Sequence, residues 1–189
     1  MADHIGEQFE TVLEAARAGA GWAADRLWQS LAPSVAGYLR VQGAAEPDDL
    51  TSEVFLGVFG GLGSFSGGEE QLRAWVFTIA HRRLTDERRQ TARRPPPASL
   101  DTEHNHEQGS PAPSAEHDAL RRLSAERVQR LCEQLVPDQR DVLLLRLVGG
   151  LTVEEVAAGL DKSPGAVKAL QRRGLAALRK NFDREGVPL

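Results

Sequence analysis

The stretch "LTVEEVAAGLDKSPGAVKALQRRG", residues 151–174, decides the fold of the second half of this chain. Thr152 followed by Glu155 matches a capping box, which predicts a short helix that begins directly after Thr152. Ser163 is a favoured N-cap and Pro164 suits a first helical turn, where no amide donor is needed, so a second helix is predicted from there. Two helices joined by so tight a turn are typical of a helix-turn-helix.

The second helix of this motif is apolar on one side and cationic on the other. From Lys162 to Lys180 the chain carries six Lys or Arg residues and no acid. The N-terminus of such a helix can hold a phosphate while its early side chains enter the major groove of DNA. A helical hairpin that only packs on its neighbours is the alternative, and the one-sided charge argues against it. The residues predicted to contact duplex DNA are Ser163, Pro164, Gly165, Lys168, Arg172 and Arg173.

The formal net charge of −4 hides a strong segregation of charge along the chain. Residues 1–70 hold three arginines against eleven acids, whereas residues 71–94 hold seven arginines against two acids. With the helix of residues 162–180, this makes two basic segments in an otherwise acidic chain. Either segment alone could be a solvated helix face, but two of them suggest two separate contacts with a polyanion.

A composition change divides the chain into two parts. The segment "RRPPPASLDTEHNHEQGSPAPSAEHD", residues 93–118, is rich in Pro, Ser, His and acids and poor in apolar residues. Such a segment cannot bury enough surface to fold, so it is predicted to be a linker. We expect an all-α protein with a first domain at 1–94, a flexible, acidic and Pro-rich linker at 95–118, and a helix-turn-helix domain at 119–189. The linker histidines lack cysteines or an ordered frame around them, so no metal and no cofactor are expected.

Helical periodicity runs through both parts, without alternating β-branched segments. The first part is predicted to form helices from about Phe9, across 22–41, from 47 to about 62, and from about 71 to 89. The glycine-rich stretch "GVFGGLGSFSGG", residues 57–68, is predicted to be a flexible loop, because it lacks the Gly-Lys-Ser/Thr ending of a phosphate-binding loop. The second part is predicted to add helices at about 116–135 and after Pro137.

The helix predicted at 71–89 has two distinct sides. Leu72, Val76 and Leu84 belong to an apolar stripe. The opposite side combines arginines, hydroxyls and a histidine, which suits the phosphates and base edges of DNA. The residues predicted for this second nucleic-acid contact are Thr78, His81, Arg82, Thr85, Arg88 and Arg89.

Several features point to a cytoplasmic location. The only cysteine is Cys132, which excludes a disulfide framework and fits a reducing compartment. The first residues carry acids and no apolar run, so no signal peptide is expected. No stretch of about 18 apolar residues occurs, so no membrane contact is expected.

Three motifs, in this order, resemble the bacterial RNA polymerase sigma factors of the extracytoplasmic-function (ECF) group. They are "PDDLTSEVFLGVF" (47–59), "RAWVFTIAHRRLTDERRQ" (73–90) and "LVPDQRDVLLLRLVGGLTVEEVAAGLDKSPGAVKALQRRGLAALRK" (135–180). The resemblance covers residues 20–180 approximately. The last motif alone is also similar to response-regulator activators, so the two upstream motifs make the match specific.

The resemblance implies a promoter-specificity subunit rather than an enzyme. The first domain would bind the clamp of core RNA polymerase and melt the −10 element of promoter DNA. The second would read the −35 element, with the linker threading the polymerase between them. An anti-sigma protein is implied as a further partner. The implied polymerase-binding residues are Asp48, Asp49, Leu50, Glu53, Val54 and Phe55.

The chain departs from the family pattern at Arg82, Ala166 and Leu170, where relatives often carry Asn, Thr and Arg. The promoter sequences read by a relative therefore cannot be transferred to it. Two other hypotheses stay open at this point. A stand-alone helix-turn-helix regulator would need no clamp-binding segment, and a metal-dependent nucleic-acid enzyme would need ligands beyond Asp48, Asp49 and Glu53.

Overall fold

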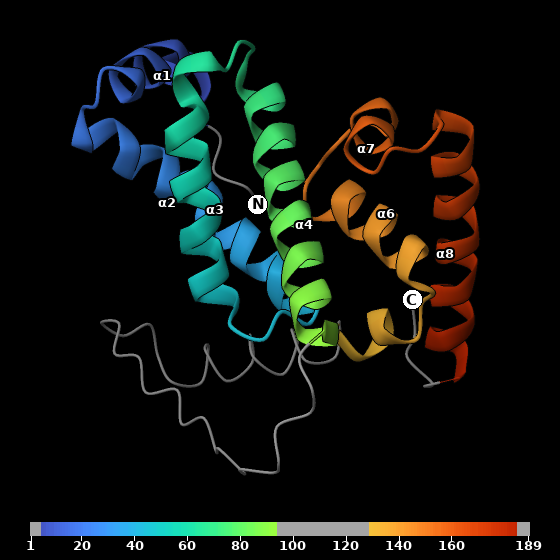
Figure 1. Cartoon of the computed structure of the whole chain (residues 1–189). Coiled ribbons are helices and arrows are strands. Elements are labelled where there is room, and N and C mark those ends of the chain that lie inside the picture. The colour runs from blue at the N-terminus through green and yellow to red at the C-terminus, as the bar shows by residue number, and fades with distance from the viewer. Residues whose placement is uncertain (1–4, 94–128, 185–189) are drawn as a thin grey trace, which may run out of the picture.

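The structure is a computed structural model that describes residues 5–93 and 129–184. Within these two ranges the chain forms helices joined by turns, and no strand is present. The helices form two units that lie side by side, with α4 (Glu69–Arg93) at the boundary between them (Figure 1). The predicted all-α class is confirmed, whereas the predicted linker at 95–118 lies outside the described residues.

The first unit contains α1 (Phe9–Arg17), α2 (Gly21–Val41), α3 (Pro47–Gly61) and α4, with short 3-10 turns at Gly6–Gln8 and Leu62–Ser64. All four predicted helices are present, and α4 is longer at both ends than its periodicity indicated. The core is rich in aliphatic side chains and contains a few aromatic pairs. Tyr38 of α2 meets Phe77 of α4 edge to face, with ring centroids 5.6 Å apart. Apolar burial of this kind is the main force that holds the four helices together.

The prediction of a flexible loop at 57–68 is wrong for most of its length. Residues 57–61 continue α3, residues 62–64 form a 3-10 turn, and only the last residues form an open connection to α4. Of these glycines, Gly61 serves close packing between α3 and α4. A Cβ added at Gly61 would lie 3.0 Å from the indole ring of Trp75, and one at Gly57 would lie 3.7 Å from Ile79. A side chain at Gly61 would therefore crowd the Trp75 ring, whereas the contact at Gly57 is an ordinary one.

The second unit contains a helical turn at 129–133, then α6 (Pro137–Leu147), α7 (Val153–Gly159) and α8 (Pro164–Arg184). Val142, Leu145, Val156 and Val167 are among its fully buried side chains. At Gly174, α8 approaches α6 so closely that an added Cβ would lie 2.7 Å from Leu143. Most of the helix predicted at 116–135 falls outside the described residues.

The helix-turn-helix predicted from the opening stretch is confirmed in detail. The Thr152 hydroxyl accepts a hydrogen bond of 3.2 Å from the Glu155 amide, and the Glu155 carboxylate accepts one of 2.7 Å from the Thr152 amide. Ser163 caps α8 by accepting a hydrogen bond of 3.2 Å from the Ala166 amide. Asp161 adopts a left-handed φ of 53° in the turn between α7 and α8, a conformation that Asp tolerates better than most residues. Local side-chain chemistry thus fixes both helix starts.

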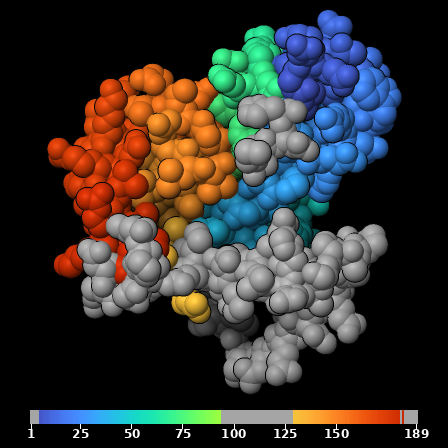
Figure 2. Space-filling model, turned by 180° about the vertical axis from the view of Figure 1, so that it is seen from behind, coloured from blue at the N-terminus to red at the C-terminus, as the bar shows by residue number. Residues whose placement is uncertain are grey.

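In both views α8 lies on the side of the molecule away from the first unit (Figure 1 and Figure 2). The α6 and α7 helices occupy the space between α8 and α4 (Figure 1). No helix among the described residues is both long and apolar enough to cross a membrane.

Candidate nucleic-acid interface

The first candidate surface is the exposed side of α8. Lys168, Arg172 and Arg173 are all solvent-exposed and follow directly on the exposed first turn of the helix. Arg173 donates only to a carbonyl of its own helix, that of Ala169, at 3.3 Å. Because no acid of the described chain forms an ion pair with these three side chains, their charge is available to an external anion. The structure thus brings the predicted Ser163, Pro164, Gly165, Lys168, Arg172 and Arg173 together on one exposed part of α8.

Lys162, which precedes α8, behaves differently from the cations on the helix. Its ammonium lies 2.9 Å from the Asp138 carboxylate at the start of α6. This ion pair joins the turn of the motif to α6, so Lys162 supports the orientation of α7 and α8 and its charge is already neutralised.

The second candidate surface is the side of α4 formed by Thr78, His81, Arg82, Thr85, Arg88 and Arg89, which we call the α4 face. The two hydroxyls are used within the helix, because Thr78 donates to the Ala74 carbonyl (2.8 Å) and Thr85 donates to the His81 carbonyl (2.9 Å). Arg88 donates to the backbone carbonyl and to the side-chain oxygen of Gln42. These side chains are therefore held by protein partners in this structure.

All three arginines of the α4 face are exposed, although Arg88 is engaged with Gln42. Arg82 and Arg89 project into a groove between α4 and the end of α7, with a volume of about 540 Å³. Asp161 lines the groove from the second unit, and Asp86 lies 3.6 Å from Arg89. Cationic side chains in an open groove can bind phosphate, although the nearby acids reduce the net positive charge.

His81 is half-buried, so that it lines the groove and also makes polar contacts with the interior. Its Nδ1 lies 3.0 Å from the Tyr38 hydroxyl, which also receives a hydrogen bond of 3.3 Å from the Gln42 amide. Burial lowers the pKa of His81, and the nearby Asp141 carboxylate opposes this shift in part. Burial also raises the pKa of Tyr38 well above its ordinary value. Both groups are thus held in their neutral forms, which suits a hydrogen-bonded interior better than a phosphate contact.

The acidic segment at the start of α3 separates into two sets of residues. Asp48, Asp49 and Glu53 are exposed, and Asp48 forms an ion pair of 3.3 Å with Arg40. The other set packs inside the first unit, and of its members only Leu50 also lines a groove, the one between α3 and α4. It consists of Leu50, Val54 and Phe55.

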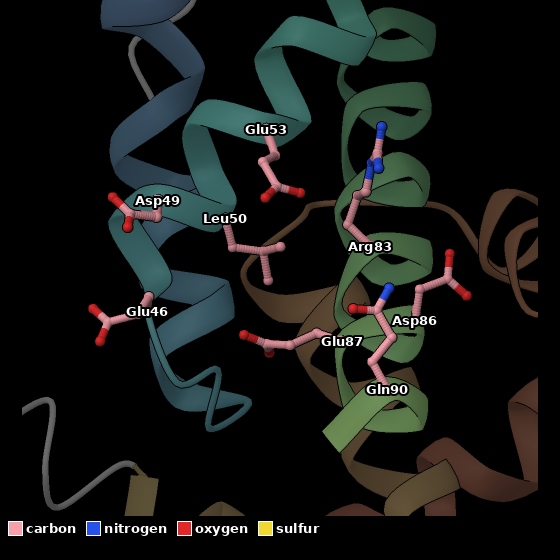
Figure 3. A pocket seen from close by; sticks show the side chains of 8 residues that line it. All are labelled: Glu46, Asp49, Leu50, Glu53, Arg83, Asp86, Glu87 and Gln90. Carbon is pink, nitrogen blue, oxygen red and sulfur yellow. The ribbon is translucent and has the colours of Figure 1, made fainter. Parts of the chain in front are cut away.

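A groove of about 290 Å³ lies between α3 and α4 beside this segment. Glu53 and Glu87 point from the two helices toward the space between them, close to Leu50, whereas Asp49 points away (Figure 3). Arg83 is the only cation among the lining residues, so the groove is acidic. A basic surface would complement it.

The sequence did not indicate which apolar residues beside the acids would be exposed. Leu56 is 74% exposed, one helical turn after Glu53. Trp28 of α2 is 38% exposed and lines a further groove with Pro33 and Thr51, while its ring also packs on Phe55. The only signal for this surface in the sequence is the spacing of Leu56, three residues after the acidic Glu53 on the same predicted helix.

Contacts between the two units were also missed by the sequence interpretation. Arg73 of α4 donates to the carbonyls of Gly149 (2.6 Å) and Val148 (3.2 Å), just after α6. Gln42 at the end of α2 donates to the Asp141 carboxylate at 2.7 Å. Arg73 was counted with the basic segment, whereas the structure uses it to join the two units.

The chain matches known proteins over both units. Residues 27–94 match the family model described as sigma-70 region 2, and residues 125–178 match sigma-70 region 4. It is 30% identical to the ECF RNA polymerase sigma factor BldN of Streptomyces coelicolor over 95% of this chain and 67% of that protein. It is 32% identical to the ECF RNA polymerase sigma factor SigD of Mycobacterium tuberculosis over 92% of this chain and 84% of that protein.

Among solved structures, CnrH in complex with the cytosolic domain of CnrY has a similar fold. The TM-score is 0.67 at 22% identity, over 94% of this chain and 99% of CnrH. Sigma-70 regions 2 and 4 are both present, and ECF relatives at 30% identity or above align with most of the chain. This chain belongs to the ECF RNA polymerase sigma factors.

Proposed function

We propose that this chain is a promoter-specificity subunit whose three exposed surfaces have separate tasks. The exposed side of α8 reads the −35 element, the α4 face holds the melted −10 strand, and the acidic part of α3 binds core RNA polymerase. The proposal rests mainly on the exposed cationic side of α8, which follows α7 in the chain. The start of α7 is fixed by a complete capping box. The role we propose is recognition rather than catalysis, in the cytoplasm, where a polymerase and promoter DNA would be met.

The −35 contact rests on the geometry of α8. Its N-terminus is open to solvent, and Lys168, Arg172 and Arg173 are exposed. A helix presented in this way can enter the major groove, where arginine pairs with guanine. Ala166 is also exposed on the first turns, so a small side chain is available for an apolar contact with a base.

The −10 contact rests on the arginines of α4. Arg82 and Arg89 already line the groove, together with His81 and Thr85 of the α4 face. An unpaired base held in a protein pocket offsets part of the cost of unstacking. The α4 face would thus act after the duplex has been found.

The polymerase contact rests on α3. Asp49 and Glu53 are exposed one helical turn apart, and Leu56 follows one turn later. An exposed apolar side chain framed by acids suits a partner surface that is basic with an apolar centre. The buried Leu50, Val54 and Phe55 would support this surface from below.

The polymerase contact can be tested with a charge-reversed variant, Asp49→Lys with Glu53→Lys. A matched control is Glu10→Lys with Glu14→Lys on α1, which also reverses two exposed acids one turn apart. The first variant should lose binding to purified core RNA polymerase, while the control should bind as the wild type does. Equal binding by all three proteins would refute the assignment of α3.

A regulatory protein is part of the proposal as well. The family resemblance implies an anti-sigma partner, and CnrH was solved with the cytosolic domain of another protein bound to it. The exposed grooves beside α3 are the surfaces at which such a protein would compete with the polymerase.

A further inference from the structure

The first half of α2 has an exposed side that the other described helices leave uncovered. Its members recur three or four residues apart, so they share one side of the helix. We call this set the α2 face, and it consists of the exposed residues Trp22, Asp25, Arg26, Gln29 and Pro33. The start of α2 lies at the edge of the first unit that is turned away from α8 (Figure 1). This face is therefore open to a partner.

Two tryptophans give this side of α2 a large apolar surface. Trp22 is 58% exposed and Trp28 is 38% exposed. The Trp28 ring packs on Phe55, with ring centroids 4.7 Å apart, whereas Trp22 stacks on no ring of the described chain. Tryptophan is enriched in protein interfaces and among the residues that contribute most to binding. Its exposure here indicates an interaction surface.

Two grooves meet on the α2 face. One, of about 390 Å³, lies between α1 and α2 and is lined by Trp22, Asp25 and Arg26. The other, of about 490 Å³, lies between α2 and α3. Apart from Gln29, the residues of α2 that line this second groove are Trp28, Ala32, Pro33 and Ala36. Because Gln29 lines both grooves, they form one continuous depression along α2.

The centre of the α2 face carries two adjacent charges of opposite sign. Asp25 and Arg26 are both exposed, and neither forms an ion pair within residues 5–93 and 129–184. If two copies pack antiparallel about a two-fold axis between these positions, each Asp25 faces the Arg26 of the other copy. A parallel arrangement would instead oppose like charges. The α2 face is thus complementary to itself in one orientation.

The same orientation brings the tryptophans to the grooves. With Asp25 opposite Arg26, the antiparallel spacing places Trp22 opposite Gln29 of the other copy, at the junction of the two grooves. The indole can then enter the second groove beside Trp28 and Pro33. Burial of a tryptophan removes roughly 150–250 Å² from water, and the two-fold axis makes this contribution twice.

We propose that this chain forms an antiparallel homodimer through the α2 face, with Trp22 of each copy in the groove beside Trp28 of the other. The two Asp25–Arg26 pairs fix the register at the centre. An interface limited to one helix face and its grooves is small, so the dimer is reversible and forms at micromolar concentrations.

The dimer does not depend on the proposed function, but one consequence of it does. Asp48 and Ser52 of α3 line the groove that receives Trp22. The dimer therefore covers one end of the acidic segment that we assign to core RNA polymerase. A chain engaged in the dimer cannot present this segment in full, so polymerase binding and dimer formation exclude each other.

Sedimentation equilibrium of the full chain gives the first test. The wild type should change from monomer to dimer between about 1 µM and about 200 µM. Trp22→Ala should raise the dissociation constant at least about 30-fold, because it removes a central anchor from both copies. Leu147→Ala, which removes an apolar side chain that is 65% exposed on α6, is the matched control and should dimerise as the wild type does. Circular dichroism checks that the helices are retained.

Charge reversal tests the two-fold pairing. Asp25→Arg leaves two cations at the centre of the α2 face, and Arg26→Asp leaves two acids there. Each variant alone should therefore stay monomeric at concentrations where the wild type dimerises. An equal mixture of the two variants should form a heterodimer, because both central pairs then combine opposite charges. Sedimentation velocity with a fluorescent label on one variant detects this heterodimer.

The outcomes separate the dimer from the proposed function. A wild type that stays monomeric over the whole range would overturn the dimer and leave the α2 face to a different protein. Undiminished dimerisation of Trp22→Ala, or a mixture of the charge variants that stays monomeric, would overturn it as well. Loss of polymerase binding by the wild type would instead remove the proposed function, with the dimer intact. A polymerase complex that contains the dimer would overturn the mutual exclusion.

Discussion

Gln42, at the end of α2, donates a hydrogen bond of 2.7 Å to Asp141 of α6, a residue 99 positions further along the chain. Its amide nitrogen also donates to the Tyr38 hydroxyl at 3.3 Å, and its side-chain oxygen accepts from Arg88 at 3.2 Å. One uncharged, buried side chain therefore links a carboxylate of the second unit to a phenol and a guanidinium of the first.

Truncation of this link should destabilise the protein. Gln42→Ala removes the side-chain amide that donates to Asp141 and the side-chain oxygen that accepts from Arg88, while the backbone carbonyl that also accepts from Arg88 is retained. The loss of the buried partner of Asp141 costs roughly 1–3 kcal/mol in the free energy of unfolding. Urea unfolding of the full chain measures this loss. Gln29→Ala, at an exposed position of α2, is the control and should change the free energy by less than about 0.5 kcal/mol. Equal effects of the two substitutions would contradict the role given to Gln42.

Stability should fall as the solution becomes mildly acidic, because of His81. Burial lowers its pKa in the folded state below the ordinary value of 6.5, although Asp141 opposes the shift, while Arg88 and Lys162 add to it. Between these two pKa values the unfolded chain binds more protons than the folded chain. The contribution of neutral His81 is therefore fully present above about pH 6.5 and is lost as the pH falls toward the folded-state pKa.

Unfolding free energies of the wild type and of His81→Gln, measured from about pH 7.5 to about pH 5, test this dependence. Titration of the carboxylates is common to both proteins and cancels in the comparison. The wild type should lose more stability over this range than His81→Gln. Parallel curves would show that His81 has an ordinary pKa in the folded protein.

The capping box of α7 should contribute measurably to the free energy of unfolding. Thr152→Ala removes the oxygen that accepts from the Glu155 amide, and the loss of such a cap costs about 0.5–2 kcal/mol. Thr91→Ala, near the exposed end of α4, is the control and should be close to neutral. Thermal unfolding of both variants checks the difference. A neutral Thr152→Ala would mean that packing of Val156 alone fixes the start of α7.

The sequence predicted best those features that depend on neighbouring residues. The Thr152 and Ser163 caps are chemical preferences that act within four residues, and both were predicted. Gly57 and Gly61 were misread as a loop because glycine favours turns in general. Both continue α3, and the close approach at Gly61 depends on Trp75, which no local pattern reveals.

Contacts between distant residues could not be predicted. Arg73 binds carbonyls 75 and 76 positions away, and before folding nothing distinguishes it from Arg82 or Arg83. The side of α3 that faces inward was also unclear, because acids and apolar residues alternate there too closely for one stripe to stand out. The exposure of Leu56 and the burial of Phe55 follow from packing against α2 and α4.

Base recognition by α8 should reside in Arg172 and Arg173. Substitution of either by Ala should weaken binding to a promoter duplex by roughly 1–3 kcal/mol if the side chain reaches a base edge. Lys180→Ala, on a later turn of α8, should reduce binding to all sequences alike, with a shallower salt dependence. Fluorescence anisotropy with promoter and random duplexes separates these effects. Equal losses on both duplexes would assign Arg172 and Arg173 to phosphate contacts only.

The most direct measurement of the central claim is transcription with purified components. Core RNA polymerase of the organism that encodes this chain would transcribe its chromosomal DNA with and without the purified protein, and the 5′ ends of the RNA would be mapped. The account predicts new, discrete start sites that share a −10 and a −35 element, and their loss with the Asp49→Lys, Glu53→Lys variant. The same start sites with and without the protein would contradict it.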